Sequence, residues 1–157
     1  MRIGKWVCAL VCVVLMAVVF LPSFTAGQDE QTMRGVQRVR VRTMKSISRA
    51  MRRVKVYTKK ANYKRVAAAA EEITLLSAAI PYLSPKGSAF GKTRIKAEVW
   101  SRFDDYTKIA RDSAQIARNV AKAAQAKDKN AVLKAFSALS DSCTQCHKPF
   151  RKKKKRK

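Results

Sequence analysis

The sequence predicts an all-α protein, an antiparallel four-helix bundle, on three observations. The chain of 157 residues has the length of one domain, and its 47% of hydrophobic residues are enough for a packed core. Only 5 glycines and 4 prolines occur, while alanine, the best helix former, is abundant. Beyond residue 30, apolar side chains recur at helical spacing in four segments, with one long break in the middle. Amphipathic helices joined by short, long and short connections are typical of such a bundle.

The first 27 residues are predicted to be a signal peptide. Arg2 and Lys5 precede an apolar run over 6–21, and small residues follow it, so we expect cleavage after Gly27 or Ala26. An uncleaved membrane anchor is the alternative, because this run is only slightly shorter than the usual span of about 20 residues. In both cases the protein is exported and a periplasmic location is expected. The bundle domain is then 28–151, and 152–157 form a basic tail.

The first two helices are expected over about 32–58 and 62–83. The apolar stripe of the first consists of Val36, Met44, Ile47, Met51 and Val54. The stripe of the second consists of Val66, Ala70, Ile73, Leu76, Ile80 and Leu83, with Pro81 at its fraying end. The stretch 84–91, with two glycines and a proline, is the predicted long connection.

The third and fourth helices are expected over about 96–125 and from about 130 to 147, joined by a short turn at 127–129. The third has one face made of Trp100, Phe103, Ala110, Ala114, Ala117, Ala121 and Ala124, whose small residues permit close helix packing. The fourth begins at Asn130, a good N-cap, and has Val132, Phe136 and Leu139 on its apolar face. The same face then continues through two cysteines to the only histidine of the chain.

That C-terminal stretch, Cys143-Thr144-Gln145-Cys146-His147, has the spacing of a c-type haem attachment site. In such a site both thiols add to the haem vinyl groups and the histidine binds the iron. Cys8 and Cys12 fall in the predicted signal peptide, which leaves this pair alone in the mature protein. A disulfide would close a very small loop, and a thioredoxin-like pair would need a strand-rich fold that the sequence does not indicate. A zinc site would need another Cys or His ligand. One covalent haem c is therefore the predicted cofactor.

The bundle topology suggests where a second iron ligand would come from. In an antiparallel bundle, the beginning of the first helix lies beside the end of the fourth. The side of the iron opposite His147 should therefore face the first helix.

Several stretches together resemble the class II cytochromes c, the cytochrome c′ family. They are Arg40-Val41-Arg42-Thr43-Met44-Lys45, Pro85-Lys86-Gly87-Ser88, Ile95-Lys96-Ala97-Glu98-Val99-Trp100 and the C-terminal stretch from Cys143 to Arg151. The resemblance covers about 33–151. It implies a four-helix bundle, often a homodimer, with one covalent haem on the C-terminal helix.

Two types of site occur in that family. Low-spin members bind the iron with a methionine, and Met44 stands at their position, with Met51 as a fallback. Cytochromes c′ proper leave the distal side open and bind nitric oxide or carbon monoxide. A methionine opposite a histidine raises the reduction potential and suits electron transfer. We therefore predict His147 and Met44 as axial ligands, with a core-filling role for Met44 as the alternative.

Other side chains are candidates for haem contacts. Arg151 lies four residues after His147, and similar proteins have a basic residue there that could pair with a propionate or tune the histidine. Pro149 complicates this prediction, because proline disturbs the last helical turn. Trp100, Phe103 and Phe136 could line the haem edge, or could simply belong to the core.

The charge of the chain is strongly positive. Its formal net charge is +25, and loss of Arg2 and Lys5 with the signal peptide leaves +23. Thirteen basic and no acidic residues lie between Arg34 and Ala70, and the last seven residues are all basic. An acidic redox partner or an anionic membrane surface fits this distribution, whereas export argues against nucleic acid as the physiological target. The basic first helix also weakens the expectation of a dimer through the first two helices.

The sequence-based prediction is a bacterial exported monohaem cytochrome that carries single electrons and is not an enzyme. No nucleophile with a base and no pair of carboxylates at useful spacing is visible. One alternative is a five-coordinate cytochrome c′ that binds nitric oxide or carbon monoxide. Another is a polyanion-binding module in which the haem only stabilises the fold.

Overall fold

The computed structural model describes residues 25–153, with side chains from residue 29. The predicted signal peptide up to residue 24 and the last four residues of the predicted tail lie outside the described residues. The chain divides into two compact units. The first ends at Met33, and its described part is the beginning of helix α2. The second starts at Arg34 and contains the helical bundle.

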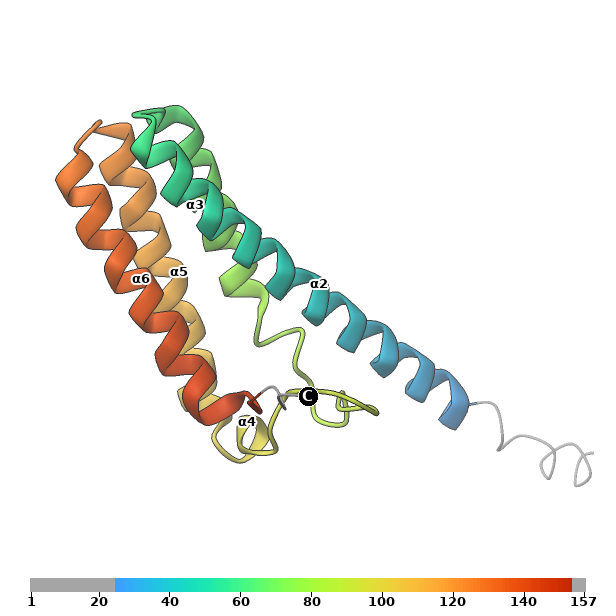
Figure 1. The fold of residues 1–157 in the computed structure, drawn as a ribbon. Coiled ribbons are helices and arrows are strands. Elements are labelled where there is room, and N and C mark those ends of the chain that lie inside the picture. Colours follow the sequence, from blue (N-terminus) through green and yellow to red (C-terminus); the bar gives the residue numbers. More distant parts are fainter. Residues whose placement is uncertain (1–24, 154–157) are drawn as a thin grey trace, which may run out of the picture. The chain divides into compact units, whose positions relative to one another are not determined.

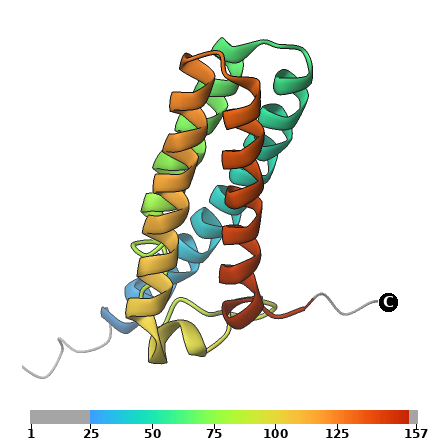
Figure 2. The same cartoon turned by 90° about the vertical axis from the view of Figure 1, so that its left-hand side faces the viewer.

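The second unit is the predicted all-α, antiparallel four-helix bundle (Figures 1 and 2). Its long helices are α2 (Thr25–Lys59, from Arg34 onward in this unit), α3 (Tyr63–Ala79), α5 (Phe103–Gln125) and α6 (Lys129–Phe150). A short α4 (Glu98–Ser101) precedes α5. The α2–α3 and α5–α6 turns lie at one end of the bundle. Helix α4, the long connection from α3 and the end of α6 lie at the other.

The hydrophobic core follows the predicted stripes. Val54 of α2, Ile73 of α3, Val120 of α5 and Leu139 of α6 are almost fully buried and belong to one cluster. Alanines of α3 and α5, such as Ala70 and Ala117, are also fully buried, and their small side chains let neighbouring helices pack closely.

The helix ends differ from the predictions in several places. The third predicted helix is interrupted at Arg102, whose backbone (φ −132°, ψ 46°) separates α4 from α5. The predicted N-cap Asn130 is wrong, because Asp128 caps α6 by accepting a hydrogen bond from the Ala131 amide at 2.9 Å. Helix α3 ends at Ala79 instead of residue 83, just before Pro81, and α2 starts at Thr25, earlier than expected.

The long connection between α3 and α4 is tied to α2 by side chains. Gln37 donates to the Phe90 carbonyl (3.1 Å) and accepts from the Phe90 amide (2.6 Å). Arg40 donates to the Leu83 carbonyl (2.8 Å) and to the hydroxyl (2.8 Å) and carbonyl (2.7 Å) of Ser88. These bonds satisfy backbone groups that no helix or strand satisfies, so the connection has a defined course.

Candidate functional site

Cys143, Cys146 and His147 all lie in α6, within its last two turns, and all are half-buried. Both cysteines are free thiols. Burial raises the pKa of both, that of Cys146 to about 11, where the neighbouring Cys143 adds a further increase. Burial therefore favours the protonated form of both thiols near neutral pH.

The imidazole of His147 is kept neutral by its surroundings. Its pKa is lowered first by burial and then by the positive charges of Arg151 and Arg94. A neutral imidazole is the form that binds a metal. Two thiols and one neutral imidazole on a single helix fit the donor set of a covalent haem c: the thiols could form the thioethers and His147 could bind the iron.

The end of α6 is arranged differently from the sequence-based expectation for Arg151. The helix runs through Pro149 to Phe150, and the Arg151 amide donates to the His147 carbonyl at 3.1 Å. Arg151 itself is extended (φ −124°, ψ 128°) and forms an antiparallel bridge with Ile95. Its guanidinium is still close enough to lower the pKa of His147. The position of Arg151 is therefore set by its pairing with Ile95 and not by a continuation of α6.

The side chains predicted to bind the iron opposite His147 or to contact the haem differ in how far they are buried. Met44 and Met51 of α2 are half-buried and pack against the core cluster, as do Cys146, Trp100 and Phe136. The indole nitrogen of Trp100 donates to the Ser84 carbonyl at 3.1 Å. Phe103, in contrast, is 38% exposed. The structure thus brings Met44 and Cys146 to one apolar core and leaves Phe103 at the surface.

Two polar side chains near this core were not predicted as site residues. Arg40 is only 7% exposed and Tyr106 only 4%. The hydroxyls of Tyr106 and Ser84 lie 3.0 Å apart, and the Tyr106 ring meets the edge of Phe150 at 5.2 Å between centroids. Tyr106 also interacts electrostatically with Cys146. The sequence signal was available in part, because Arg40 occupies a core position four residues before Met44.

Burial of Tyr106 leads to a testable pH dependence. Its pKa is raised, mainly by burial and only partly offset by the hydrogen bond with Ser84. The folded state thus holds the phenol proton more tightly than the unfolded state, whose pKa is about 10. Its stabilising contribution is complete below that value and is lost as pH rises through the folded pKa.

We therefore expect the free energy of unfolding to fall above pH 10 more steeply in the wild type than in Tyr106→Phe. Urea unfolding at pH 8 to 11 measures this difference. Tyr82→Phe, at a tyrosine that is 81% exposed, is the control and should keep the wild-type slope. Equal slopes in all three proteins would contradict the assignment.

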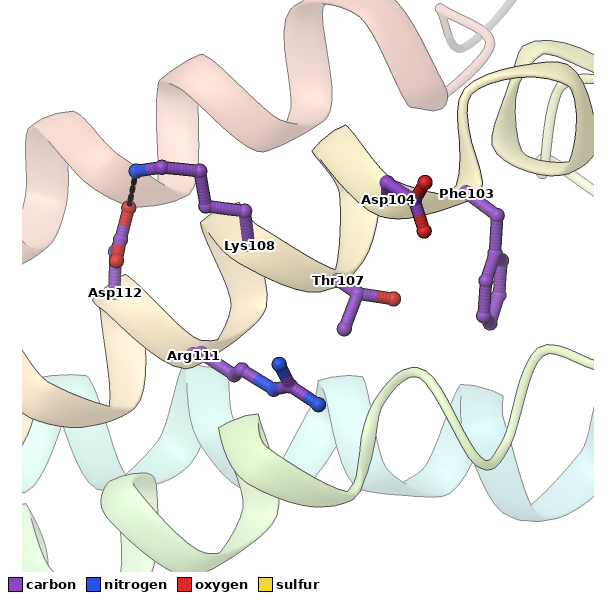
Figure 3. Close-up of a pocket in the computed structure, with 6 residues that line it drawn as sticks. All are labelled: Phe103, Asp104, Thr107, Lys108, Arg111 and Asp112. Carbon is purple, nitrogen blue, oxygen red and sulfur yellow. Dashed lines mark hydrogen bonds and ion pairs between the residues drawn. The ribbon is translucent and has the colours of Figure 1, made fainter.

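A surface pocket lies away from these residues. It has a volume of about 400 Å³ and is lined by Phe103, Asp104, Thr107, Lys108, Arg111 and Asp112, all from α5 (Figure 3). Lys108 and Asp112 form an ion pair across one turn at 2.8 Å, and the buried Thr107 hydroxyl has no hydrogen-bond partner in the described part of the chain. The pocket contains no cysteine, histidine or methionine, so it is not the haem site.

Within 25–153, no three side chains of His, Cys, Asp or Glu converge in a way that could hold a metal ion. No helix in that range is long and apolar enough to cross a membrane.

Comparison with known proteins gives a consistent result. The family model described as Cytochrome C′ matches residues 36–151. A cytochrome c′ from Pararhodospirillum photometricum is 40% identical over 83 residues, which are 52% of this chain and 66% of that protein. The match thus spans slightly less than two thirds of that curated relative.

Solved structures agree over a longer range. The cytochrome c′ from Thermochromatium tepidum is 26% identical, with a TM-score of 0.72 over 77% of this chain and 97% of the other. A second cytochrome c′, described as having an unusual ligand-controlled dimer dissociation, has the same identity and coverage and a TM-score of 0.71.

These matches contradict one sequence-based prediction. The prediction of an electron carrier with Met44 on the iron is wrong, because the matching family model and relatives are cytochromes c′, the type in which the distal side is open. In the structure, the half-buried side chain of Met44 packs against the apolar core cluster. The chain carries one covalently attached haem c and belongs to the cytochrome c′ family.

Proposed function

We propose that this protein binds a diatomic gas, nitric oxide or carbon monoxide, at a five-coordinate haem iron. Cys143 and Cys146 hold the haem through thioethers, and His147 is the single protein ligand of the iron. Bound haem supplies the iron that takes the gas; the residues of this chain attach it, orient it and shield it. In this role the protein is a binding protein and not an enzyme.

The observation that carries this proposal is the match to the cytochrome c′ family over 36–151, which includes both sides of the site. The local structure supports it. The neutral, half-buried His147 is suited to bind iron, and the thiols lie four and one residues before it on the same helix. Trp100 and Phe136, half-buried against the core, are proposed to line the haem.

Met44 is proposed to cover the open side of the iron without binding it. Met44 lies on α2, the helix whose beginning the bundle topology places beside the end of α6. Its side chain packs against the core cluster. An apolar cover keeps water out and makes a gas compete with the methionine side chain for space. Removing most of this side chain should therefore strengthen gas binding.

Optical spectra of the ferric and ferrous protein, with and without carbon monoxide, test the proposal. We expect a high-spin spectrum that changes on addition of carbon monoxide. Met44→Ala should keep the high-spin spectrum and bind carbon monoxide roughly tenfold more tightly, because about 1.4 kcal/mol of steric cost is removed. The matched control Met51→Ala, one heptad further along α2, should leave the affinity within a factor of two or so.

A different result would exclude this function. A low-spin wild-type spectrum with a methionine-to-iron charge-transfer band, insensitive to carbon monoxide, would show a closed iron. Loss of that band in Met44→Ala would identify the ligand.

A homodimer is the proposed assembly, with α3 as its contact surface. Leu75 is 72% exposed, and Ala68 and Ala78 are also exposed on α3. No Lys or Arg occurs from Val66 to Pro85, although the chain as a whole is strongly basic. This apolar surface allows two copies to meet without bringing basic side chains together. The ligand-controlled dimer of the related structure supports the proposal.

Sedimentation equilibrium measures the assembly. Leu75→Arg should shift the protein to monomer, since two buried charges would face each other across the two-fold axis. Leu133→Arg, at an exposed leucine of α6, is the control and should not change the mass. A wild-type monomer at all concentrations would refute the dimer.

Location and further partners follow from the sequence. We propose an exported, periplasmic protein whose signal peptide is 1–27 and whose domain is 28–151. The exposed basic residues of α2 and the tail 152–157 are proposed to attract an anionic membrane surface or an acidic protein, with an affinity that falls as salt rises.

A further inference from the structure

Shortly after His147, residues 150–152 are hydrogen-bonded to residues 94–96, the segment that precedes α4. The Lys96 amide donates to the Phe150 carbonyl at 3.1 Å, and the Lys152 amide donates to the Arg94 carbonyl at 2.8 Å. Ile95 and Arg151 form the antiparallel bridge between them. These two segments, 94–96 and 150–152, are called the C-terminal clip below.

The side chain of Arg94 strengthens this clip. Its Nε donates to the Lys152 carbonyl at 3.0 Å, and its Nη2 donates to the same oxygen at 2.7 Å. Two charged donors on one carbonyl are stronger than the neutral backbone bonds beside them. Arg94 therefore contributes three hydrogen bonds to the clip, two from its side chain and one to its own carbonyl.

The clip is needed because the end of α6 is weak by itself. Pro149 has no amide hydrogen and cannot donate to the preceding turn. Beyond it the chain becomes a run of basic residues that repel one another. Phe150 gives an anchor, since it is buried and packs against Tyr106, but the two residues after it are exposed. Apart from the bond of the Arg151 amide to the His147 carbonyl, the clip provides the hydrogen bonds that hold Arg151 and Lys152 in the described part of the chain.

Two arginines are brought to the end of α6 as a result. Arg151 follows His147 by one helical turn, and its amide donates to the His147 carbonyl, while Arg94 is bonded to Lys152, the next residue after Arg151. The positive charges of both arginines lower the pKa of His147. Neither arginine has an ion pair with an acidic side chain among residues 29–153. The like charges would separate if nothing held the two segments together.

We propose that Arg94 is a positioning residue for the proximal side of the haem: by binding the Lys152 carbonyl it holds Arg151 next to His147. This inference rests on the proposed role of His147 as iron ligand. Arg151 would then place positive charge near the imidazole, which would weaken the donation from the imidazole to a bound iron. Arg94 acts through Arg151 and does not need to touch the haem.

The first test does not depend on the iron. In the haem-loaded protein, amide hydrogen exchange of Lys96 and Lys152 should accelerate roughly tenfold in Arg94→Ala, because the clip opens more often. Lys92→Ala removes one exposed positive charge from the same connection and is the matched control. Arg94→Lys can still donate to the carbonyl and should restore most of the protection. Unchanged exchange in Arg94→Ala would overturn the proposal.

The second test asks whether Arg94 acts through Arg151. The iron–histidine stretching band of the ferrous protein should shift in Arg94→Ala and in Arg151→Ala, and stay in place in Lys92→Ala. In the double variant Arg94→Ala/Arg151→Ala, the shift should equal that of Arg151→Ala alone. Full additivity, or a shift in Lys92→Ala of the same size, would overturn the positioning role.

The two tests separate this inference from the proposed function. A six-coordinate ferrous iron that does not react with carbon monoxide would refute gas binding, and amide exchange alone would then decide whether the clip depends on Arg94. A five-coordinate iron with unchanged exchange in Arg94→Ala would leave gas binding intact and refute the clip.

Discussion

Replacing both Cys143 and Cys146 with alanine should abolish covalent haem attachment. Each thioether requires a thiol, and the mature chain has no other cysteine if the first 27 residues are removed. Haem should then be extracted completely by acidified organic solvent, and a denaturing gel stained for haem should show no band. The wild type should keep its haem in both assays.

The residues between the two cysteines provide a matched control. Thr144 and Gln145 are exposed on the same turn of α6, so Thr144→Ala/Gln145→Ala changes the local sequence without removing a thiol. This variant should retain covalent haem. Haem that resists extraction in the double cysteine variant would show that another residue holds it.

Replacing Arg40 with leucine should destabilise the folded protein by about 3 kcal/mol. The guanidinium is 7% exposed and donates three hydrogen bonds to the long connection, at 2.7 to 2.8 Å. Leucine cannot replace these donors, and the Leu83 and Ser88 carbonyls would lose their charged partners in a buried place. Burial lowers the pKa of Arg40, yet arginine remains charged at neutral pH.

Urea unfolding followed by circular dichroism measures this loss. Arg38→Leu, two residues earlier on the exposed side of α2, is the control and should change stability by less than about 0.5 kcal/mol. Arg40→Lys keeps the charge but loses the geometry of the guanidinium, so its effect should be intermediate. Equal effects of Arg40→Leu and Arg38→Leu would show that the connection does not depend on Arg40.

Local features of the sequence were sufficient to predict much of the molecule. The apolar periodicity identified four long helices, because an amphipathic helix reveals its buried face through spacing alone. Residues such as Val54, Ile73 and Leu139 are buried as that spacing requires. The Cys143–His147 stretch identified the cofactor, because covalent haem attachment needs its donors within one helical turn.

Other features depend on contacts between residues far apart in the chain. The break between α4 and α5 falls at Arg102, within a stretch whose periodicity suggested one helix. The electron-carrier function assigned through Met44 was predicted incorrectly, because a methionine on an apolar helical face looks the same whether it binds iron or fills space. Family comparison, rather than spacing, corrected that assignment.

The sequence alone determined the helices and their buried faces and predicted the residues that attach the haem, because each is encoded within a few turns of chain. Only the tertiary structure decided what surrounds the attachment site. Arg40 binds a connection more than forty residues away, and Arg94 binds Lys152 across 58 residues. Tyr106 likewise contacts residues far from it in the chain, through a hydrogen bond with Ser84 and ring packing with Phe150. Hydrogen bonds between distant segments leave no periodic pattern in the sequence, so they become visible only once the helices are packed.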